Sequence, residues 1–369
     1  MLILTSPLTP QRALRSARLV RGVTLIELMI GLLLGLVVVL VTAQVLSFAE
    51  GQKRVTTGGA DAQVNGALGL YTLQREIQMA GYGLLADLGS LGCPITANHA
   101  TAGAFNWTLA PVTITAGVGG APDTVTVMSS SRAYAVPASI SVDHPITSDR
   151  FTVRSALGMS AGDMLFVVPV AISATNWCAA YQVTQVANIN QAVHAITSPW
   201  NSGAQVAPAA GYVAGDRIVN AGQLTLRTFS IDANYSLQQR TLDLASGGWQ
   251  AQELFPQIVM LRALYGKDTN ADNVVDTYDN TTPTTNAGWR QVRAVRIALV
   301  ARSSSYQKDE VTTADPQWDV GTVVTIAGTT ACGSSKCLAL PVSGVPDWKH
   351  YRYSVFEVTA PLRNVIWGQ

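Results

Sequence analysis

Residues 22–48 read GVTLIELMIGLLLGLVVVLVTAQVLSF, an almost unbroken run of apolar side chains near the beginning of the chain. A helix needs ~20 such residues to cross the hydrocarbon core of a membrane. The segment before the run has no acidic residue and contains four arginines, Arg12, Arg15, Arg18 and Arg21. Because basic residues hold their flank on the cytoplasmic side, the rest of the chain is expected outside the cytoplasm. The pattern therefore predicts a targeting leader over residues 1–22 and a membrane-spanning helix after it.

A plain signal anchor is the simplest interpretation of this run. A cleaved secretory signal has a shorter apolar region, of ~7–15 residues, followed by small residues at a cleavage site, and no such site follows here. Glu27 argues against a plain anchor, because a carboxylate inside an apolar span costs ~2.5–3.5 kcal/mol at the centre of a helix. No Lys or Arg lies one or two turns after it. We therefore expect Glu27 to find a positive partner in another chain or in a new amino terminus.

Composition limits what the remainder can be. The chain has 369 residues, of which 48% are hydrophobic and 13% charged. It is too apolar for a disordered protein and has too few charges for a coiled coil. With 24 basic and 23 acidic groups, it also lacks the basic excess that nucleic-acid binding needs. A folded domain outside the cytoplasm is expected.

The segment from Gly22 to Leu28 resembles the class III signal of type IV pilins and of type II secretion pseudopilins. The resemblance implies that a prepilin peptidase cuts between Gly22 and Val23 and methylates the new amine of Val23. It also implies that Glu27, at mature position five, pairs with the terminal amine of a neighbouring subunit during assembly. Val23 stands where this family more often has phenylalanine, which leaves the cut plausible.

A second part of the helix is expected beyond the membrane, because no proline occurs between Pro10 and Pro94. Apolar residues recur there every three or four positions, at Val64, Ala67, Leu70, Leu73, Ile77 and Ala80. This stripe is expected to pack on a globular head, and Gly81 and Gly83 are expected to end the helix. The segment 73–82, LQREIQMAGY, resembles the end of the stalk helix in PilW-type minor pilins, which are related to J-type pseudopilins.

From about residue 95 onward the sequence is typical of β-structure. The predicted strands include residues 124–128, 165–168, 181–186, 224–229 and 292–300. No long helical pattern separates them, which excludes a doubly wound α/β enzyme. The predicted fold is α+β, with a long N-terminal membrane-spanning and stalk α-helix packed on a large antiparallel β head, as in type IV pilins.

Five segments follow from this prediction. Residues 1–22 form the prepilin leader, 23–50 the transmembrane and assembly helix, and 51–83 the amphipathic stalk helix. Residues 95–250 form a β subdomain, and 251–369 form a C-terminal β head. Three further phrases, residues 254–268, 289–302 and 351–364, resemble the PilW-type family in the expected order.

The stretch 268–279, DTNADNVVDTYD, has an oxygen-bearing group at alternate positions, as calcium loops do. The ligands expected for Ca²⁺ are Asp268, Asn270, Asp272, the Val274 carbonyl, Asp276 and Asp279. Position six is Asn273 instead of glycine, and asparagine tolerates the left-handed conformation needed there. The alternative is a solvated acidic hairpin loop. Four acids close together repel one another without a cation, so Ca²⁺ is the favoured interpretation.

Four cysteines are present, Cys93, Cys178, Cys332 and Cys337. An even number outside the cytoplasm indicates disulfides, with three possible connectivities. Cys332 and Cys337 enclose only four residues, so local pairing is the most economical. Cys93 and Cys178 would then join the end of the stalk to the β head. A zinc site is the alternative, although neither C-x-x-C nor a nearby His pair supports it.

Catalytic motifs are weak in this chain. Gly158 to Gly162 match G-x-S-x-G around Ser160, but a strand-like run follows where a nucleophile elbow needs a helix. The four histidines, His99, His144, His194 and His350, share no ligand spacing and are expected to be surface or packing residues. We therefore expect a protein that is not an enzyme.

The resemblance implies a minor pilin that helps to initiate type IV pilus assembly and sits at or near the pilus tip. It would be held in the inner membrane with a periplasmic head before it joins the extracellular pilus. Its partners would be the prepilin peptidase, other minor pilins, the major pilin, the inner-membrane platform protein and a large tip adhesin. Two alternatives stay open: a J-type minor pseudopilin of a type II secretion system, and an adhesion or binding module at the tip.

Overall fold

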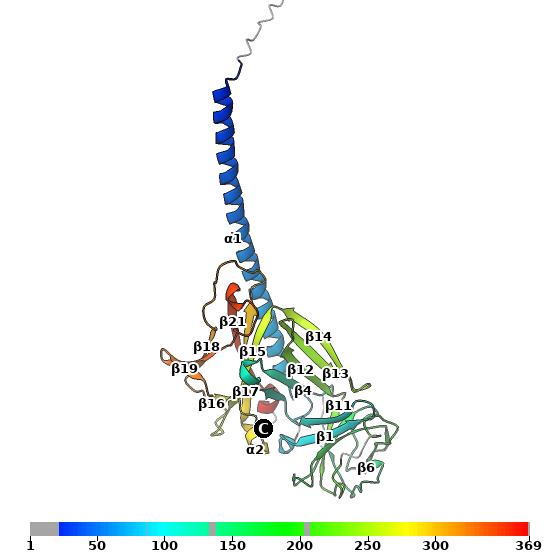
Figure 1. Ribbon diagram of the computed structural model, residues 1–369. Helices are drawn as coiled ribbons and strands as arrows, with labels where there is room; N and C mark the ends of the chain where they lie inside the picture. The colour runs from blue at the N-terminus through cyan, green and yellow to red at the C-terminus, as the bar shows by residue number, and fades with distance from the viewer. Residues whose placement is uncertain (1–21, 86, 133–137, 203–206, 368–369) are drawn as a thin grey trace, which may run out of the picture. The chain divides into compact units, whose positions relative to one another are not determined.

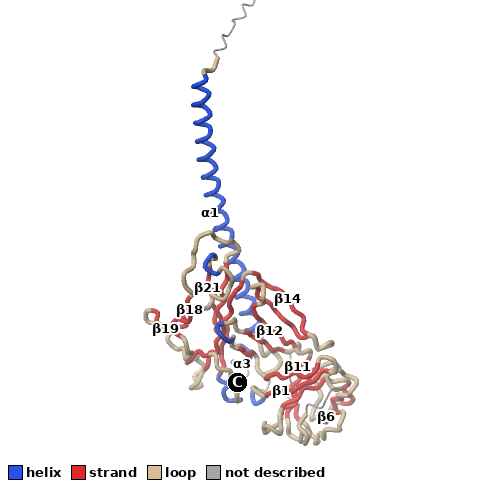
Figure 2. The backbone as a smooth tube through the Cα atoms, viewed as in Figure 1, coloured by secondary structure: helices blue, strands red, loops and turns tan. Residues whose placement is uncertain are grey.

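The computed structural model describes residues 22–85, 87–132, 138–202 and 207–367. The predicted leader therefore lies outside the described residues, apart from Gly22. The chain divides into two compact units, Met1–Arg54 and Val55–Gln369. One long helix comes first in the sequence, and mainly strands follow it (Figure 1, Figure 2). The predicted α+β class is confirmed at this level.

Helix α1 runs without interruption from Leu25 to Met79. Thr24 starts it, because its hydroxyl accepts a hydrogen bond from the backbone N–H of Glu27 at 3.3 Å. Gly81 and Gly83 end it in the left-handed region, with φ of 75° and 68°. The carboxamide of Asn364 donates to the carbonyl of Ala80 at 2.9 Å, which satisfies a group that the helix end leaves open.

The C-terminal half of α1 packs on the head through a face that the predicted stripe describes only in part. Leu73, Ile77 and Ala80 are fully buried, as expected. At the beginning of the stripe, however, Val64 is 55% exposed and Ala67 is exposed too, so these two positions are wrong, whereas Leu70 packs half-buried against the core. The buried positions there carry small residues, Gly58, Ala62, Gly66 and Gly69. A search for apolar residues at helical spacing finds a buried face that consists of large side chains. It misses a buried face that consists of glycine and alanine.

Five sheets follow α1. Three of them use only strands between residues 94 and 256. The first has the order β2-β1-β8-β7-β11-β5, formed by Gly103–Thr108, Pro94–His99, Cys178–Gln182, Met164–Val168, Arg217–Gly222 and Ala138–Ser139. The second has the order β6-β10-β9, formed by Arg150–Thr152, Gln191–Val193 and Gln185–Asn188. The third has the order β14-β13-β12-β4-β3, formed by Trp249–Pro256, Ser236–Leu242, Thr225–Ile231, Thr124–Ser129 and Val112–Thr115.

The other two sheets use strands from residue 258 onward. The fourth has the order β16-β15-β17-β21, formed by Thr277–Asp279, Ile258–Lys267, Val292–Arg302 and Tyr353–Pro361. The fifth has the order β18-β20-β19, formed by Gln317–Gly321, Ser335–Ala339 and Thr329–Cys332. Among the paired strands of the described chain, all are antiparallel except β1 with β8. The short helices are α2 (Asn286–Gln291), α3 (Arg363–Trp367), η1 (Leu88–Ser90), η2 (Val118–Gly120) and η3 (Trp348–His350).

The two central strands of the fourth sheet, β15 and β17, are buried on both faces. Leu261 and Leu299 share a core with Leu73 of α1, whereas Met260 and Val300 face a second core with Trp318 of the fifth sheet. A strand buried on both faces is apolar almost throughout, as β17 is. Each fully buried Leu or Ile contributes roughly 1.5–3 kcal/mol relative to exposure. This sheet therefore joins the helix on one side to the small sheet on the other.

Four of the five predicted strands are present, because β4, β7, β12 and β17 cover the expected residues. The fifth, residues 181–186, is wrong as a single strand. Strand β8 ends at Gln182 and β9 begins at Gln185, in a different sheet. The backbone N–H of Thr184 donates to the carbonyl of Val193 at 2.8 Å, so from this residue the chain pairs with β10 instead of β7. The predicted division of the head near residue 250 stays a prediction. Three sheets use only strands that end by residue 256, and the other two use only strands from residue 258 onward.

A third core lies between the first two sheets, and it contains a pair of histidines. His144 and His194 are almost fully buried, and their Nε2 atoms lie 2.8 Å apart. Phe151 stacks on His144 at 4.1 Å between ring centroids. Burial lowers the pKa of His144 to about 4. Burial, together with repulsion from His144, lowers the pKa of His194 to about 3. Both side chains are packing residues, as expected, but their contact could not be foreseen from positions fifty residues apart.

A Gly→Ala substitution in α1 should have opposite effects on the free energy of unfolding at two positions, one packed against the head and one exposed to open space. A methyl group at Gly66 would overlap the ring of Phe356, whereas one at Gly59 would meet no atom within 4 Å. Gly66→Ala should lower the free energy of unfolding by ~1–3 kcal/mol. Gly59→Ala should raise it by ~0.5–1 kcal/mol through helix propensity. Urea unfolding of the full chain in detergent measures both, and shifts of the same sign would contradict this packing.

The histidine pair predicts a loss of stability in mild acid. Because the folded protein holds both imidazoles neutral, the unfolded chain binds more protons below its ordinary His pKa of ~6.5. The free energy of unfolding should therefore fall from about pH 6.5 towards about pH 4, by on the order of 3 kcal/mol for each histidine. Urea unfolding across this range tests it. The double variant His144→Leu/His194→Leu should flatten the dependence, His350→Gln should retain it, and an equally steep fall in the double variant would refute the assignment.

Candidate functional site

The predicted cleavage point lies immediately before α1. Gly22 and Val23 are exposed and belong to no helix or strand. Glu27 lies in the first turn of α1, is exposed, and makes no ion pair with any other described residue. The carboxylate is thus presented on the helix surface, next to the residue that cleavage would turn into an amino terminus.

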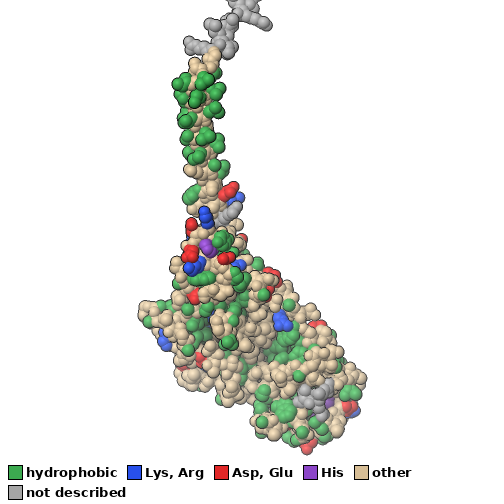
Figure 3. Space-filling view, in the orientation of Figure 1, with side chains coloured by type: hydrophobic (Ala, Val, Ile, Leu, Met, Phe, Trp, Pro, Cys, Tyr) green, Lys and Arg blue, Asp and Glu red, His purple; other side chains and the backbone are tan. Residues whose placement is uncertain are grey.

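The N-terminal half of α1 exposes apolar side chains all around the helix, and Figure 3 shows those on the face in view. Within residues 22–85, 87–132, 138–202 and 207–367, α1 is the one helix long and apolar enough to cross a membrane. Gly31 and Gly35 leave a shallow groove on it, edged by Leu28, Leu32, Leu36 and Val39. A helix that is apolar all round is stable only against lipid or other apolar helices. Two glycines four residues apart let another helix approach closely.

An apolar strip continues along α1 on the side turned away from the head. Val64, Leu68 and Tyr71 lie on one helical face, and each is roughly half exposed or more. Exposed apolar groups in a row are typical of an interaction surface. Sequence reasoning assigned Val64 to the head contact, so this strip was missed.

The calcium-type loop joins β15 to β16, and its polar groups are largely satisfied within the chain. Asp268 is buried and lies 3.2 Å from Arg293. Although burial raises the pKa of Asp268, the N–H groups of Asn273 and Ala271 and the charge of Arg293 outweigh it and hold this pKa below its usual value. Asp279 lies 2.6 Å from Lys267. The first and last expected ligands therefore already have basic partners.

The middle of the loop is different. The carboxamide of Asn270 donates to Asp272 at 3.1 Å and to Asp276 at 3.2 Å. Asn273 adopts the left-handed conformation expected at position six, with φ of 69°. Asp272 and Asp276 form no ion pair within the described part of the chain. The loop thus brings three of the expected ligand residues together, linked by the carboxamide of Asn270.

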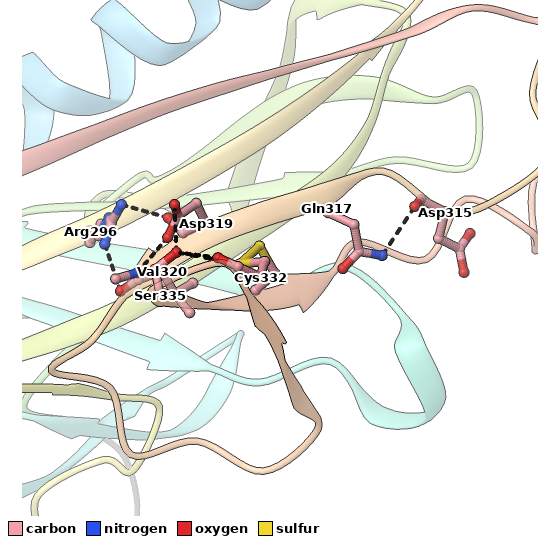
Figure 4. The surroundings of a disulfide bond; sticks show 9 residues. Arg296, Asp315, Gln317, Asp319, Val320, Cys332 and Ser335 are labelled. Carbon is pink, nitrogen blue, oxygen red and sulfur yellow. Dashed lines mark hydrogen bonds between the residues drawn. A yellow bond between two sulfur atoms is a disulfide. The ribbon is translucent and has the colours of Figure 1, made fainter.

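The four cysteines form two disulfides, Cys93–Cys178 and Cys332–Cys337. This is the pairing that local economy favoured. The first ties the segment after α1 to β8, beside the parallel β1–β8 contact in which Ile95 faces Cys178. The second closes the β19–β20 hairpin (Figure 4). The sulfur atoms of this hairpin lie near Asp319, but both are bonded and neither is a free thiolate ligand.

An arginine connects the hairpin to the central sheet. Arg296 of β17 donates to the carbonyl oxygens of Asp319 and Val320 at 2.8 and 2.9 Å, as Figure 4 shows. Arg296 also forms an ion pair with Glu357 at 2.8 Å. Ser335 beside the disulfide donates to the Asp319 carboxylate at 2.9 Å. These groups hold the small sheet on the fourth sheet.

Ser160 lies in a turn, and its backbone N–H donates to Asp163 at 2.9 Å. The element that follows is strand β7, not a helix. The geometry that a nucleophile elbow requires is therefore absent at this serine.

Residues 228–364 match the family model described as Type IV Pilus-assembly protein W. The matched region runs from β12 into α3, and it contains all three C-terminal phrases that resemble PilW-type minor pilins. No curated protein and no solved structure matches the chain. The match supports a type IV pilus assembly-associated protein. Within that class, it supports a PilW-type pilus protein.

Proposed function

We propose that this chain is a minor pilin that helps to initiate type IV pilus assembly and remains at or near the pilus tip. The observation that carries the proposal is the exposed apolar helix that begins at Leu25, with an unpaired Glu27 in its first turn. The PilW-type match in a different part of the chain supports it independently.

Processing by a prepilin peptidase would create the partner that Glu27 lacks. The bond between Gly22 and Val23 lies in exposed backbone outside any helix, which suits attack by a peptidase. The cut would expose the amine of Val23, which the same enzyme would methylate. In an apolar bundle, the carboxylate of one subunit and the amine of the next would neutralise each other. That contact would set the register between subunits.

The remaining surfaces fit the same role. The groove at Gly31 and Gly35 would admit neighbouring helices, and the exposed strip of Val64, Leu68 and Tyr71 would extend the contact beyond the membrane. Two disulfides are compatible with an oxidising compartment, so the head would be periplasmic before assembly and extracellular afterwards. The partners would be other minor pilins, the major pilin, the platform protein and a large tip adhesin. The role is structural, not catalytic.

A gene deletion scored for surface pili and for secreted exoproteins tests the assignment. Loss of pili with normal secretion is the expected result. Loss of secretion with normal pili would overturn it in favour of a J-type pseudopilin, in which the same cleavage and the same glutamate would serve another machine.

Complementation with Glu27→Ala tests the register contact. Leaving one member of a desolvated ion pair unpaired costs ~3–5 kcal/mol. The variant should therefore reach the membrane and be cleaved, yet fail to restore pili. Glu50→Ala, which removes an exposed carboxylate from the same helix, should restore them. Full piliation with Glu27→Ala would contradict the proposed pairing.

We also propose that the loop of residues 268–279 binds Ca²⁺ when the ion is present. Asp272 and Asp276 would supply carboxylates, with oxygens of Asn270 and Val274, after the carboxamide of Asn270 turns its oxygen inward. Asp268 and Asp279 would contribute only if they shared their oxygens with Arg293 and Lys267. Because two of the four acids are already neutralised, we expect the weak affinity of extracellular modules, with Kd of about 10⁻⁴–10⁻³ M.

Isothermal calorimetry on the full chain in detergent measures this binding. The wild type should bind about one Ca²⁺, Asp272→Ala should abolish binding, and Asp309→Ala, an exposed acid outside the loop, should not change it. Absence of heat at millimolar Ca²⁺ in the wild type would refute calcium binding. The loop would then be an acidic loop whose polar groups are satisfied by residues of the chain itself.

A further inference from the structure

A groove of about 360 Å³ lies between the first and third sheets of the head. Strand β2 and the beginning of β14 contribute its aromatic side chains, and β3, β4 and β12 contribute hydroxyl groups. The residues that carry the inference are Asn106, Trp107, Thr113, Thr126, Thr228 and Trp249. A volume of this size falls within the range of small-molecule sites, which is roughly 300–1,000 Å³.

The hydroxyl groups are aligned by strand register. Thr113 of β3 lies directly opposite Thr126 of β4, and Thr126 lies directly opposite Thr228 of β12. Directly paired residues point to the same face of a sheet, so the three threonines form a row across three strands. The hydroxyls of Thr126 and Thr228 are 3.2 Å apart. The hydroxyl of Thr113 makes no hydrogen bond to any other described residue.

Two indole rings border this row, and each is fixed in place. Trp107 contacts Phe105 and Trp200, with ring centroids 5.3 and 5.8 Å away. The guanidinium of Arg240 lies over the ring of Trp249, 5.6 Å from its centroid. Neither indole N–H has a hydrogen-bond partner in the part of the chain that the structure describes. By contrast, the indole N–H of Trp200 donates to the carbonyl of Leu244 at 2.7 Å.

The chemistry of the lining restricts the ligand. No Lys, Arg, His, Asp or Glu is among the lining residues. A charged ligand would therefore lose its hydration without an ionic partner. Threonine hydroxyls both donate and accept, the Asn106 carboxamide does the same, and the indole N–H groups donate. Flat indole faces add apolar contact area. A pyranose ring offers the complement, with C–H groups on its faces and hydroxyls around its edge.

We propose that this groove binds a neutral saccharide, of one or two sugar rings, as part of a glycan that the head meets outside the cell. The ligand would stack on Trp107 or Trp249 and exchange hydrogen bonds with Asn106 and the threonine row. The proposal goes beyond the assembly function. It uses no residue of the N-terminal segment and none of the calcium-type loop, so either function can fail without the other.

The full chain, purified in an amine-oxide detergent without a sugar headgroup, is the sample for the test. The probes are maltose, cellobiose, lactose and N,N′-diacetylchitobiose, titrated while tryptophan fluorescence and saturation-transfer NMR are recorded. At least one disaccharide should bind saturably with Kd of about 1 mM or lower. No saturable binding by any of the four would overturn the proposal. Binding of tri-alanine with an acetylated amino end and an amidated carboxyl end, an uncharged peptide, in their place would overturn it as well.

Variants then locate the site. Asn106 is exposed, so Asn106→Ala should leave the fold intact and weaken binding about tenfold, as the loss of one or two hydrogen bonds requires. Thr113→Val removes a hydroxyl with little change of shape and should act similarly. Thr225→Val, the same change in β12 outside the groove, should bind normally, as should Trp348→Ala. Unchanged affinity in both Asn106→Ala and Thr113→Val would overturn the assignment, and normal piliation by these variants would separate it from assembly.

Discussion

Between Gly58 and Ala80, the face of α1 that lies on the head changes from glycine and alanine to leucine and isoleucine. The small residues let β21 approach until the ring of Phe356 fills the space above Gly66. Leu73 and Ile77 then enter a core shared with Leu261 and Leu299 of the central sheet. Because the two central strands of that sheet are buried on both faces, the same contact also supports the small sheet behind it. The ion pair between Arg227 and Glu76 closes the edge of this contact at 2.6 Å.

Helix α1 also has a surface that does not contact the head. Its first half is apolar on all sides, and its second half leaves Val64, Leu68 and Tyr71 outside the head contact. Side-chain size separates the two surfaces in this part of the helix. The head packs against the small residues, and the larger apolar residues stay exposed. In an assembly of similar subunits, such a helix would remain anchored in its own head while contacting its neighbours along its length.

The head contains two polar sites that differ in charge. The loop after β15 concentrates acids and then neutralises part of that charge with Lys267 and Arg293. The groove beside β3, β4 and β12 has no charged residue in its lining and gathers hydroxyls and indoles. The ligands proposed for the two places differ accordingly: a cation for the loop and a neutral saccharide for the groove.

Sequence alone determined the features that depend on neighbours along the chain: the apolar helix from Leu25, its end at Gly81, four of the five expected strands, and the local Cys332–Cys337 bridge. It also provided the motif around Gly22 and Glu27, because an acid in an apolar run stands out without any coordinates. Tertiary structure alone decided which face of α1 is buried, that Asp268 and Asp279 face basic partners, that His144 meets His194, and that three threonines line up between two tryptophans. The reason is physical: helix period and turn chemistry act over a few residues, whereas register between distant strands and the fit of small against large side chains arise only when the whole chain packs.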